Sequence, residues 1–430
     1  MNTSHSLPIA SIDALEILDS RGTPTVKARV RLQSGALGEA AVPSGASTGA
    51  NEAVEKRDGD SRRFHGKGVL CAVQALHGEI ARALHGQDAS DQAAIDRRLV
   101  ELDGTPDKQR LGANSLLAAS MAVARAAAAT RNLPLYRSLC GDDARLLPMP
   151  MFNVLNGGKH AQSSSLDFQE FMLVPVGAPT FTEAVRMAAE VFAALRTILL
   201  AHGNSVAVGD EGGFAPRPSG GNSAACELIV QAIEHAGYRP GDDLAIALDP
   251  AATSFARAGH YVLDRAGEAQ YSSRGLVDLY ERWLDKYPIV SIEDGLAEDD
   301  WEGFAEMTRR LGQRIQIVGD DNFVTNTRYI QRGIEEGTAN AALIKPNQIG
   351  TVSETIAAVR LCQQAGWRTV ISHRSGETED AFIADFAVAV GAGQIKSGSL
   401  SRSERLAKYN RLLEIDAALG DVAEFRNPYA

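Results

Sequence analysis

The order of apolar and polar positions divides the chain into two parts with different patterns. Near the start, apolar residues at 26, 28, 30 and 32 alternate with charged ones, and this period of two predicts a half-buried strand. A second apolar run at 36–42 predicts the strand that returns beside it. Three helical patterns follow, at 68–84, 89–102 and 113–129. The last is rich in alanine, which favours a close-packed core helix over an interaction surface. Strands followed by helices are typical of an α+β domain.

Beyond Pro150 the pattern changes to short apolar runs that alternate with helical stretches. The runs lie at 205–208, 244–248, 289–292, 315–318, 341–344 and 369–372, with a further short run at 393–395. From the run at 289–292 onward the spacing is close to the roughly 25–30 residues of one strand–helix unit, and the longer step before it leaves room for an insertion. Repeated units of this kind favour a (β/α) barrel. We place the boundary before Pro148, which predicts domains at 1–142 and 143–430.

A polar or charged residue follows each of these runs. In order they are Asp210-Glu211, Asp249, Glu293, Asp320, Lys345, His373 and Lys396. Side chains at the C-terminal ends of barrel strands meet in one place, and an open doubly wound sheet would also gather them. The pattern therefore predicts one active site built from these residues.

Three of the strand ends carry carboxylates: Asp249, Glu293 and Asp320. Any one of them alone is equally typical of a helix N-cap that follows a strand. Three oxygen ligands on successive strands match Mg²⁺, and there is no cluster of His or Cys in the sequence to favour zinc. We therefore predict a magnesium site.

Two further residues suggest proton transfer. Lys345 ends an apolar strand, and nearby cations would favour its neutral form, which could act as a base. Glu211 lies between glycines in 209–213, a pattern that also fits a plain turn. Near other carboxylates, Glu211 would keep a proton more readily and could act as an acid.

Other residues suggest anion binding. The segment 373–376 offers the Arg374 guanidinium, which suits phosphate or carboxylate, and 157–160 contributes His160. A lone histidine is more often structural. The small, hydroxylated, glycine-rich segment 44–49 predicts a lid loop, although a linker would look similar, and it lacks the Gly-Lys-Ser/Thr ending of a P-loop.

Composition excludes several classes of protein. Hydrophobic residues make up 44% of the 430 residues and charged residues 23%, which is a globular balance. The net charge of −11 argues against a general binder of nucleic acid or anionic membranes. The 4 cysteines form no CxxC pair, and neither a secretory signal nor a membrane span is visible. We therefore expect a cytoplasmic protein.

Taken together, the motifs closely resemble those of the enolase (phosphopyruvate hydratase) family over nearly the whole chain. The matching segments, in family order, are Asp19–Gly22, Ser44–Gly49, Asn156–Gly158, Gln169–Phe171, Gly209–Gly213, Ser291–Gly295, Val318–Asp321, Lys345 with Asn347–Gly350, Ile371–Asp380 and Gln394–Lys396. Two prolines depart from the family pattern beside proposed site residues, Pro250 after Asp249 and Pro346 after Lys345.

The resemblance implies a fold, a reaction and a set of residues. The fold is α/β, a modified (β/α)8 TIM-like barrel preceded by a smaller α+β capping domain with its lid at 44–49. The reaction is the reversible, Mg²⁺-dependent dehydration of 2-phospho-D-glycerate to phosphoenolpyruvate, with two Mg²⁺ per site. The implied catalytic residues are Lys345 as base and Glu211 as acid, with Glu170 as its partner. The implied substrate contacts are His160, Glu170, His373, Arg374, Ser375 and Lys396. The implied metal ligands are Asp249, Glu293, Asp320 and, for the second ion, Ser44.

Other functions remain open at this stage. A paralogue resembling carboxyphosphonoenolpyruvate synthase could act on a related phosphorylated or phosphonate three-carbon acid with the same residues. An acid-sugar dehydratase or racemase fits segments 44–49 and 373–376 less well. A scaffold role through a C-terminal lysine is not supported, because the chain ends in Tyr429-Ala430. The family resemblance also suggests a homodimer, or an octamer of dimers.

Overall fold

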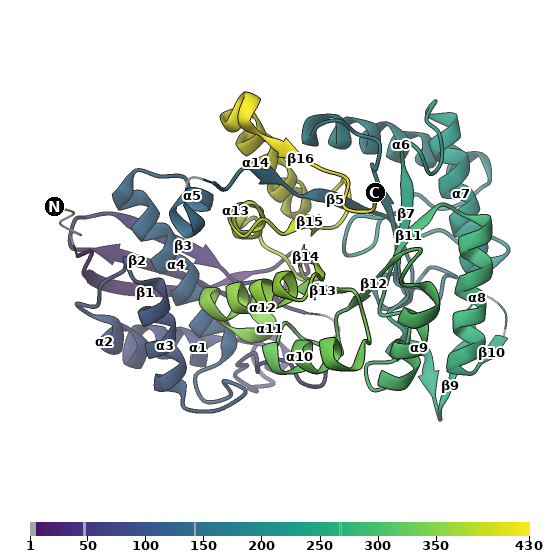
Figure 1. Ribbon diagram of the computed structural model, residues 1–430. Coiled ribbons are helices and arrows are strands. Elements are labelled where there is room, and N and C mark those ends of the chain that lie inside the picture. Colours follow the sequence, from purple (N-terminus) through teal and green to yellow (C-terminus); the bar gives the residue numbers. More distant parts are fainter. Residues whose placement is uncertain (1–5, 46–48, 142, 266, 268) are drawn as a thin grey trace.

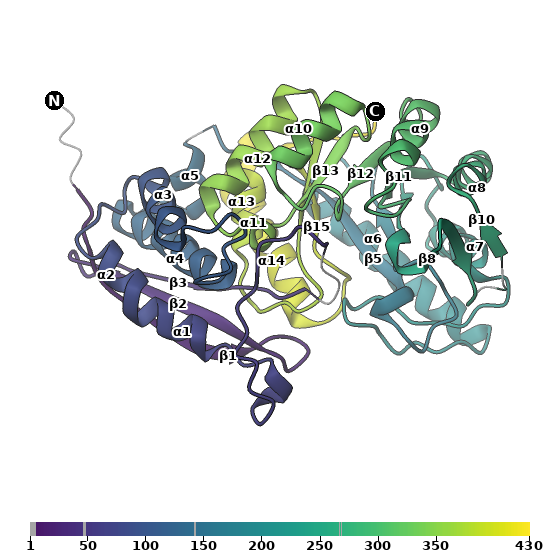
Figure 2. The same cartoon turned by 90° about the horizontal axis from the view of Figure 1, so that it is seen from below.

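The computed structural model describes residues 6–45, 49–141, 143–265, 267 and 269–430. Within these ranges the chain forms an α+β cap and a larger barrel, which lie side by side in Figures 1 and 2. The fold predicted from the sequence, a modified (β/α)8 barrel preceded by a smaller α+β domain, is confirmed. Within the described residues, none of the helices has the length and apolar character needed to cross a membrane.

The cap is a three-stranded antiparallel sheet covered by helices. Its strands, in the order β1-β2-β3, are β1 (Ile9–Leu18), β2 (Pro24–Leu32) and β3 (Leu37–Ala41). The apolar positions of β2 are buried and its charged positions face outward, as the alternation predicts. The helices are α1 (Leu70–Ala75), α2 (Ala81–Leu84), α3 (Gln92–Asp103), α4 (Ala113–Arg131) and α5 (Leu135–Cys140), with a π-helical turn, Leu76–Ile80, between α1 and α2.

Helix α4 is the core helix of the cap. Its alanine-rich sequence lets the backbone of the helix approach the sheet closely. A Cβ atom at Gly38 of β3 would lie 2.0 Å from the carbonyl oxygen of Ala122, so any larger residue would force sheet and helix apart. The small residues of α4 therefore serve packing, as the sequence predicted.

The second part is a closed barrel of eight strands in the order β11-β12-β13-β14-β15-β5-β6-β7. They are β5 (Met149–Asn156), β6 (Glu170–Val174), β7 (Ala245–Asp249), β11 (Ile289–Glu293), β12 (Gln316–Gly319), β13 (Ala341–Ile344), β14 (Arg368–Ser372) and β15 (Gly393–Lys396). Strand β6 is antiparallel to both β5 and β7, whereas the remaining pairs are parallel.

Helices surround the barrel, and a few short strands lie outside it. The helices are α6 (Phe181–Ala201), α7 (Gly221–His235), α8 (Ser273–Lys286), α9 (Trp301–Leu311), α10 (Thr327–Glu336), α11 (Pro346–Ile349), α12 (Val352–Gln364), α13 (Phe382–Ala389) and α14 (Ser403–Leu419). The short strands are β4 (Leu146–Leu147), β8 (Ala256–Arg257), β9 (His260–Leu263), β10 (Ala269–Tyr271) and β16 (Glu424–Phe425). Alternate positions of the barrel strands, among them Met149, Met151, Ala341 and Leu343, form a buried cluster of their own. This cluster fills the interior below the rim.

The structure corrects the expected start of the barrel. The run 205–208, predicted as a strand, forms no barrel strand, and only Val208 makes an isolated bridge, to Phe214. Strands β5 and β6 occupy the first two barrel positions instead. Both are buried at every position, so neither shows the alternation that marks a half-buried strand. The first cap strand, β1, was also missed.

The cap is fixed to the barrel by a partly buried ion pair. Arg125 of α4 donates to both carboxylate oxygens of Asp380, at 2.6 and 2.7 Å. The amide of Ala41 in β3 donates to the same carboxylate, at 2.9 Å. Close by, Ser44 and Gly376 exchange two backbone hydrogen bonds. These contacts seat the end of the cap sheet against a loop that follows β14.

We expect Arg125→Met to lower the free energy of unfolding by about 2 kcal/mol at neutral pH, because it leaves the largely covered carboxylate of Asp380 without its cationic partner. Burial alone would raise the pKa of Asp380, but Arg125 holds that pKa below its ordinary value. The pair therefore stabilises the fold at neutral pH, and its contribution falls once Asp380 becomes protonated, below about pH 4. In the variant, burial raises the pKa of Asp380, so the difference from the wild type should shrink on acidification. Urea unfolding at several pH values measures both effects.

Arg186→Met is the matched control, because Arg186 pairs with Glu183 and Glu190 on the exposed face of α6. It should change the stability much less. An equal loss of stability in the two variants would contradict this account of cap docking.

Candidate active site

The C-terminal ends of the barrel strands surround one narrow cavity. Ten of the twelve residues predicted for the site line it: His160, Glu170, Glu211, Asp249, Asp320, Lys345, His373, Arg374, Ser375 and Lys396. Glu293 lies beside it, in contact with Lys396. The structure thus brings these residues together from segments far apart in the sequence.

Strand ends place most of these side chains. Asp249, Glu293 and Lys396 are the last residues of β7, β11 and β15. Lys345 follows β13 and caps the start of α11, where Pro346 takes the first helical position, which suits proline. Glu170 is instead the first residue of β6, and it pairs with Asp249. Because β6 runs antiparallel to its neighbours, its first residue reaches the rim where theirs end.

Two buried lysines neutralise the carboxylates. Lys396 Nζ lies 2.9 Å from Asp249, 2.8 Å from Glu293 and 3.3 Å from Glu170. Lys345 Nζ lies 2.5 Å from Asp320, whose other oxygen accepts from Gln348 at 3.0 Å. Removing water from so many charges is favourable only because opposite charges face each other.

Asp249, Glu293 and Asp320 stand at neighbouring strand ends, but their ligand atoms do not all lie within 4.8 Å of one another, so their role as metal ligands stays a prediction. Burial and the charge of Asp249 raise the pKa of Glu293 well above its ordinary value, and its Oε2 is buried without a hydrogen-bond partner among the described residues. That atom has a free lone pair where a cation would relieve the repulsion between carboxylates. Asp294 and Asp321 lie within 4.8 Å of Asp320 and add to the acidic rim.

The charge state of Lys345 differs from the expectation. Burial lowers the pKa of Lys345, but the carboxylate of Asp320 outweighs burial and raises it. The sequence predicted that neighbouring cations would favour the neutral amine. In this structure the nearest charge is negative, which favours the ammonium form of Lys345.

A second group of titratable residues lies around His160. Its Nδ1 is 3.6 Å from Glu170 and 3.5 Å from Glu211. Burial and the charge of Glu211 raise the pKa of Glu170 well above its ordinary range. The pKa of Glu211 is lowered, because its neighbours, His160 first among them, outweigh the effect of burial. These directions favour a proton on Glu170 rather than on Glu211, and the role of Glu211 as the acid stays a prediction.

The anion-binding groups are occupied by groups of the chain itself. Arg374 donates to both oxygens of Glu52, a cap residue, at 2.9 and 3.1 Å. Ser375 Oγ lies 3.0 Å from His160 Nε2. Glu52 was missed by the sequence reasoning, although it stands three residues after the predicted lid.

Ser44 does not line the cavity, although its backbone pairs with Gly376, next to the lining residue Ser375. It is buried in the cap, where its hydroxyl donates to Glu55 at 3.1 Å and accepts from Arg57 at 2.9 Å. Residues 46–48 of the predicted lid lie outside the described residues. The role of Ser44 as a ligand of a second metal ion therefore stays a prediction.

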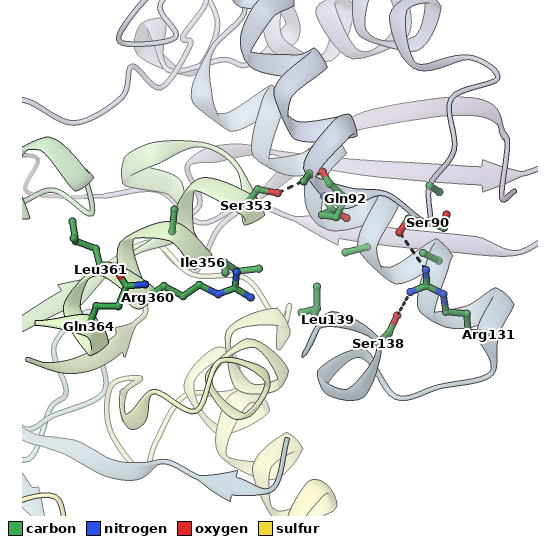
Figure 3. Close-up of a pocket in the computed structure, with 15 residues that line it drawn as sticks. Ser90, Gln92, Arg131, Ser138, Leu139, Ser353, Ile356, Arg360, Leu361 and Gln364 are labelled. Atoms are coloured by element: carbon green, nitrogen blue, oxygen red, sulfur yellow. Dashed lines mark hydrogen bonds between the residues drawn. The ribbon is translucent and has the colours of Figure 1, made fainter. Parts of the chain in front are cut away.

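A larger cavity lies elsewhere, between the cap and α12 (Figure 3). Small residues of α3 and α4 line it together with Arg131, Leu139, Ile356 and Arg360. It contains none of the residues predicted for the site. Cavity volume alone would therefore not identify the active site, because the titratable groups line the smaller cavity at the strand ends.

The fold and the site together define an acid–base enzyme built on a capped barrel, with its chemistry at the strand ends. Comparison with known proteins makes this specific. The family model described as "Enolase, N-terminal domain" matches residues 9–139, and "Enolase, C-terminal TIM barrel domain" matches residues 144–428. A curated relative, "Enolase 1" of Methylococcus capsulatus (strain ATCC 33009 / NCIMB 11132 / Bath), is 61% identical over 417 residues, which cover 97% of this chain and 99% of the relative.

The chain therefore belongs to the enolase family. It is a phosphopyruvate hydratase, a lyase of glycolysis, as the sequence motifs predicted. The alternative of a phosphonate-specific paralogue is not favoured.

Proposed function

We propose that this chain dehydrates 2-phospho-D-glycerate reversibly to phosphoenolpyruvate with Mg²⁺, using the residues gathered at the rim. The observation that carries the proposal is the joint presence of Lys345 and the Glu170–Glu211 pair in one narrow cavity. A base and an acid from separate segments face the same small space. That arrangement suits removal of a proton and of a hydroxyl group from adjacent carbons.

Asp249, Glu293 and Asp320 would hold the first metal ion, and Ser44 would join a second. Bound Mg²⁺ supplies electrostatic stabilisation of the negative charge that develops on the substrate carboxylate. Lys396, next to two of these ligands, contributes a fixed positive charge at the same place.

We assign removal of the proton beside the substrate carboxylate to the Lys345 Nζ atom, which must be in its neutral form to accept it; a cation held by Asp320 would favour that form. Glu211, with Glu170 as its proton-holding partner, assists departure of hydroxide, which is a poor leaving group without an acid. His160, His373, Arg374 and Ser375 orient the substrate. Arg374 must exchange Glu52 for an anionic group of the substrate, because both compete for one guanidinium.

Several properties of the protein belong to the same proposal. The domain boundary lies at 142/143, in the segment before β5. The partner is the small-molecule substrate, with neither nucleic acid nor membrane. The protein acts in the cytoplasm as a homodimer or an octamer of dimers. The net charge of −11 supports the absence of nucleic acid as a partner.

The activity is tested with the purified protein, 2-phosphoglycerate and saturating Mg²⁺, by following the absorbance of the enol product. We expect the absorbance to rise, EDTA to abolish the rise, and added Mg²⁺ to restore it. The same mixture without protein is the control. Absence of turnover at saturating Mg²⁺ would contradict the proposed function.

A further inference from the structure

Arg405 is a fully buried arginine behind the active site, and the proposed mechanism does not use it. It belongs to the first turn of α14, and its side chain is 0% exposed. It does not line the cavity. Burying a charged side chain is unfavourable unless hydrogen-bond partners replace the water that it loses.

The guanidinium of Arg405 connects the two segments that carry the acid and the anion-binding residues. Nη1 donates to His373 Nδ1 and to the carbonyl oxygen of Arg374, both at 2.6 Å. Nη2 donates to the carbonyl oxygens of Ser375, at 2.6 Å, and of Asp210, at 3.0 Å. One planar group therefore holds the backbone on either side of the site, next to Glu211.

The surrounding chain is shaped to admit this side chain. A Cβ atom at Gly398 would lie 2.6 Å from Arg405 Cδ and 2.9 Å from the carbonyl oxygen of Glu211. Gly398 also has a φ of +78°, which favours glycine. A larger residue there would displace either the arginine stem or the Glu211 backbone.

The hydrogen bond to His373 fixes the position of a proton. A guanidinium has only N–H donors and stays charged in proteins, so His373 Nδ1 must accept with its lone pair. Neutral His373 then carries its hydrogen on Nε2. That atom lies 3.5 Å from Glu211 Oε1, so the N–H faces the proposed acid.

We propose that Arg405 is a positioning residue that holds His373 in its neutral, Nε2-protonated form and presents that N–H to Glu211. The assignment of the tautomer stands on the contacts of Arg405, and its consequence for turnover rests on the proposed function of Glu211. Burial lowers the pKa of His373 most, and among the charged groups Glu211 raises it, whereas Arg405, Lys396 and Lys345 lower it.

The test uses the full chain, labelled with [¹⁵N]histidine and studied by NMR without substrate. The His373 signals are identified by their absence in His373→Gln. In the wild type we expect an unprotonated Nδ1 and a protonated Nε2 throughout pH 6 to 8. A proton on Nδ1 in the wild type would overturn the proposal without any variant of Arg405.

Arg405→Met removes the donor and the charge. We expect His373 to populate both tautomers and to become protonated closer to neutral pH. Turnover should fall about 10- to 100-fold, the usual cost of losing a group that orients another functional side chain. Arg405→Lys, which keeps a cation and N–H donors, should recover part of this loss.

Arg411→Met is the matched control. Arg411 lies on the same helix and binds Asp385 at 2.8 and 2.9 Å, away from His373. Its loss should leave the His373 signals as in the wild type. An unchanged tautomer and pH response in Arg405→Met would also overturn the proposal. The NMR measurement is made without substrate, so its outcome does not depend on turnover. A protein without turnover would contradict the proposed function, but the tautomer of His373 could still be determined.

Discussion

Lys345→Ala should lower kcat by about 10⁴-fold, the upper range for loss of a general base. Alanine cannot accept the proton beside the substrate carboxylate. Lys396 is held by Asp249, Glu293 and Glu170 and cannot take over that role. Steady-state kinetics at saturating Mg²⁺ measure the effect.

Lys286→Ala is the control for this substitution. Lys286 is an exposed lysine at the end of α8 that pairs with Glu227. It should retain wild-type kcat. Circular dichroism of Lys345→Ala should show an intact fold, because Asp320 keeps its hydrogen bond from Gln348. A kcat within tenfold of the wild type would show that another group removes the proton.

Glu293→Gln should weaken Mg²⁺ binding by at least about 100-fold, the upper end of what loss of an orienting partner of a metal ligand costs. Glutamine keeps the size and shape of the side chain but removes the charge, and Mg²⁺ prefers carboxylate oxygens. Isothermal titration with MgCl₂ measures the affinity directly. Turnover should then need far more Mg²⁺ than in the wild type.

Glu302→Gln removes an equal charge from the exposed first turn of α9, shortly after the same strand. It should bind Mg²⁺ as the wild type does. If Glu293→Gln bound Mg²⁺ with unchanged affinity, the carboxylates at the ends of β7, β11 and β12 would not be the metal site.

Most of the barrel could be predicted because its parallel strands are short, apolar and followed by polar residues. The strands at 289–293 and 341–344 stand out for this reason. Strands β5 and β6 could not be found in this way, since they are buried on both faces and do not follow the repeating unit. The run at 205–208 has the composition of a strand, but only the closed barrel shows that all eight positions are already filled.

The active-site residues also divide into those that the sequence pattern reveals and those that only the fold reveals. Asp249, Glu293 and Lys345 were visible as polar residues at strand ends. The place of Glu170 at the rim becomes clear only from the antiparallel direction of β6. The place of Arg405 behind the site becomes clear only from the packing of α14 against two loops. The proton-holding role of Glu170 depends on burial and on the charge of Glu211, which a sequence does not display.

The central claim is that Lys345 removes a proton and that the Glu170–Glu211 pair acts in a separate step. The most direct measurement follows the hydrogen on the second carbon of 2-phosphoglycerate in deuterium oxide with Mg²⁺. We predict that Lys345→Ala stops exchange of this hydrogen with solvent, whereas Glu211→Gln continues the exchange but forms no phosphoenolpyruvate. Continued exchange in Lys345→Ala, or its loss in Glu211→Gln, would contradict the account.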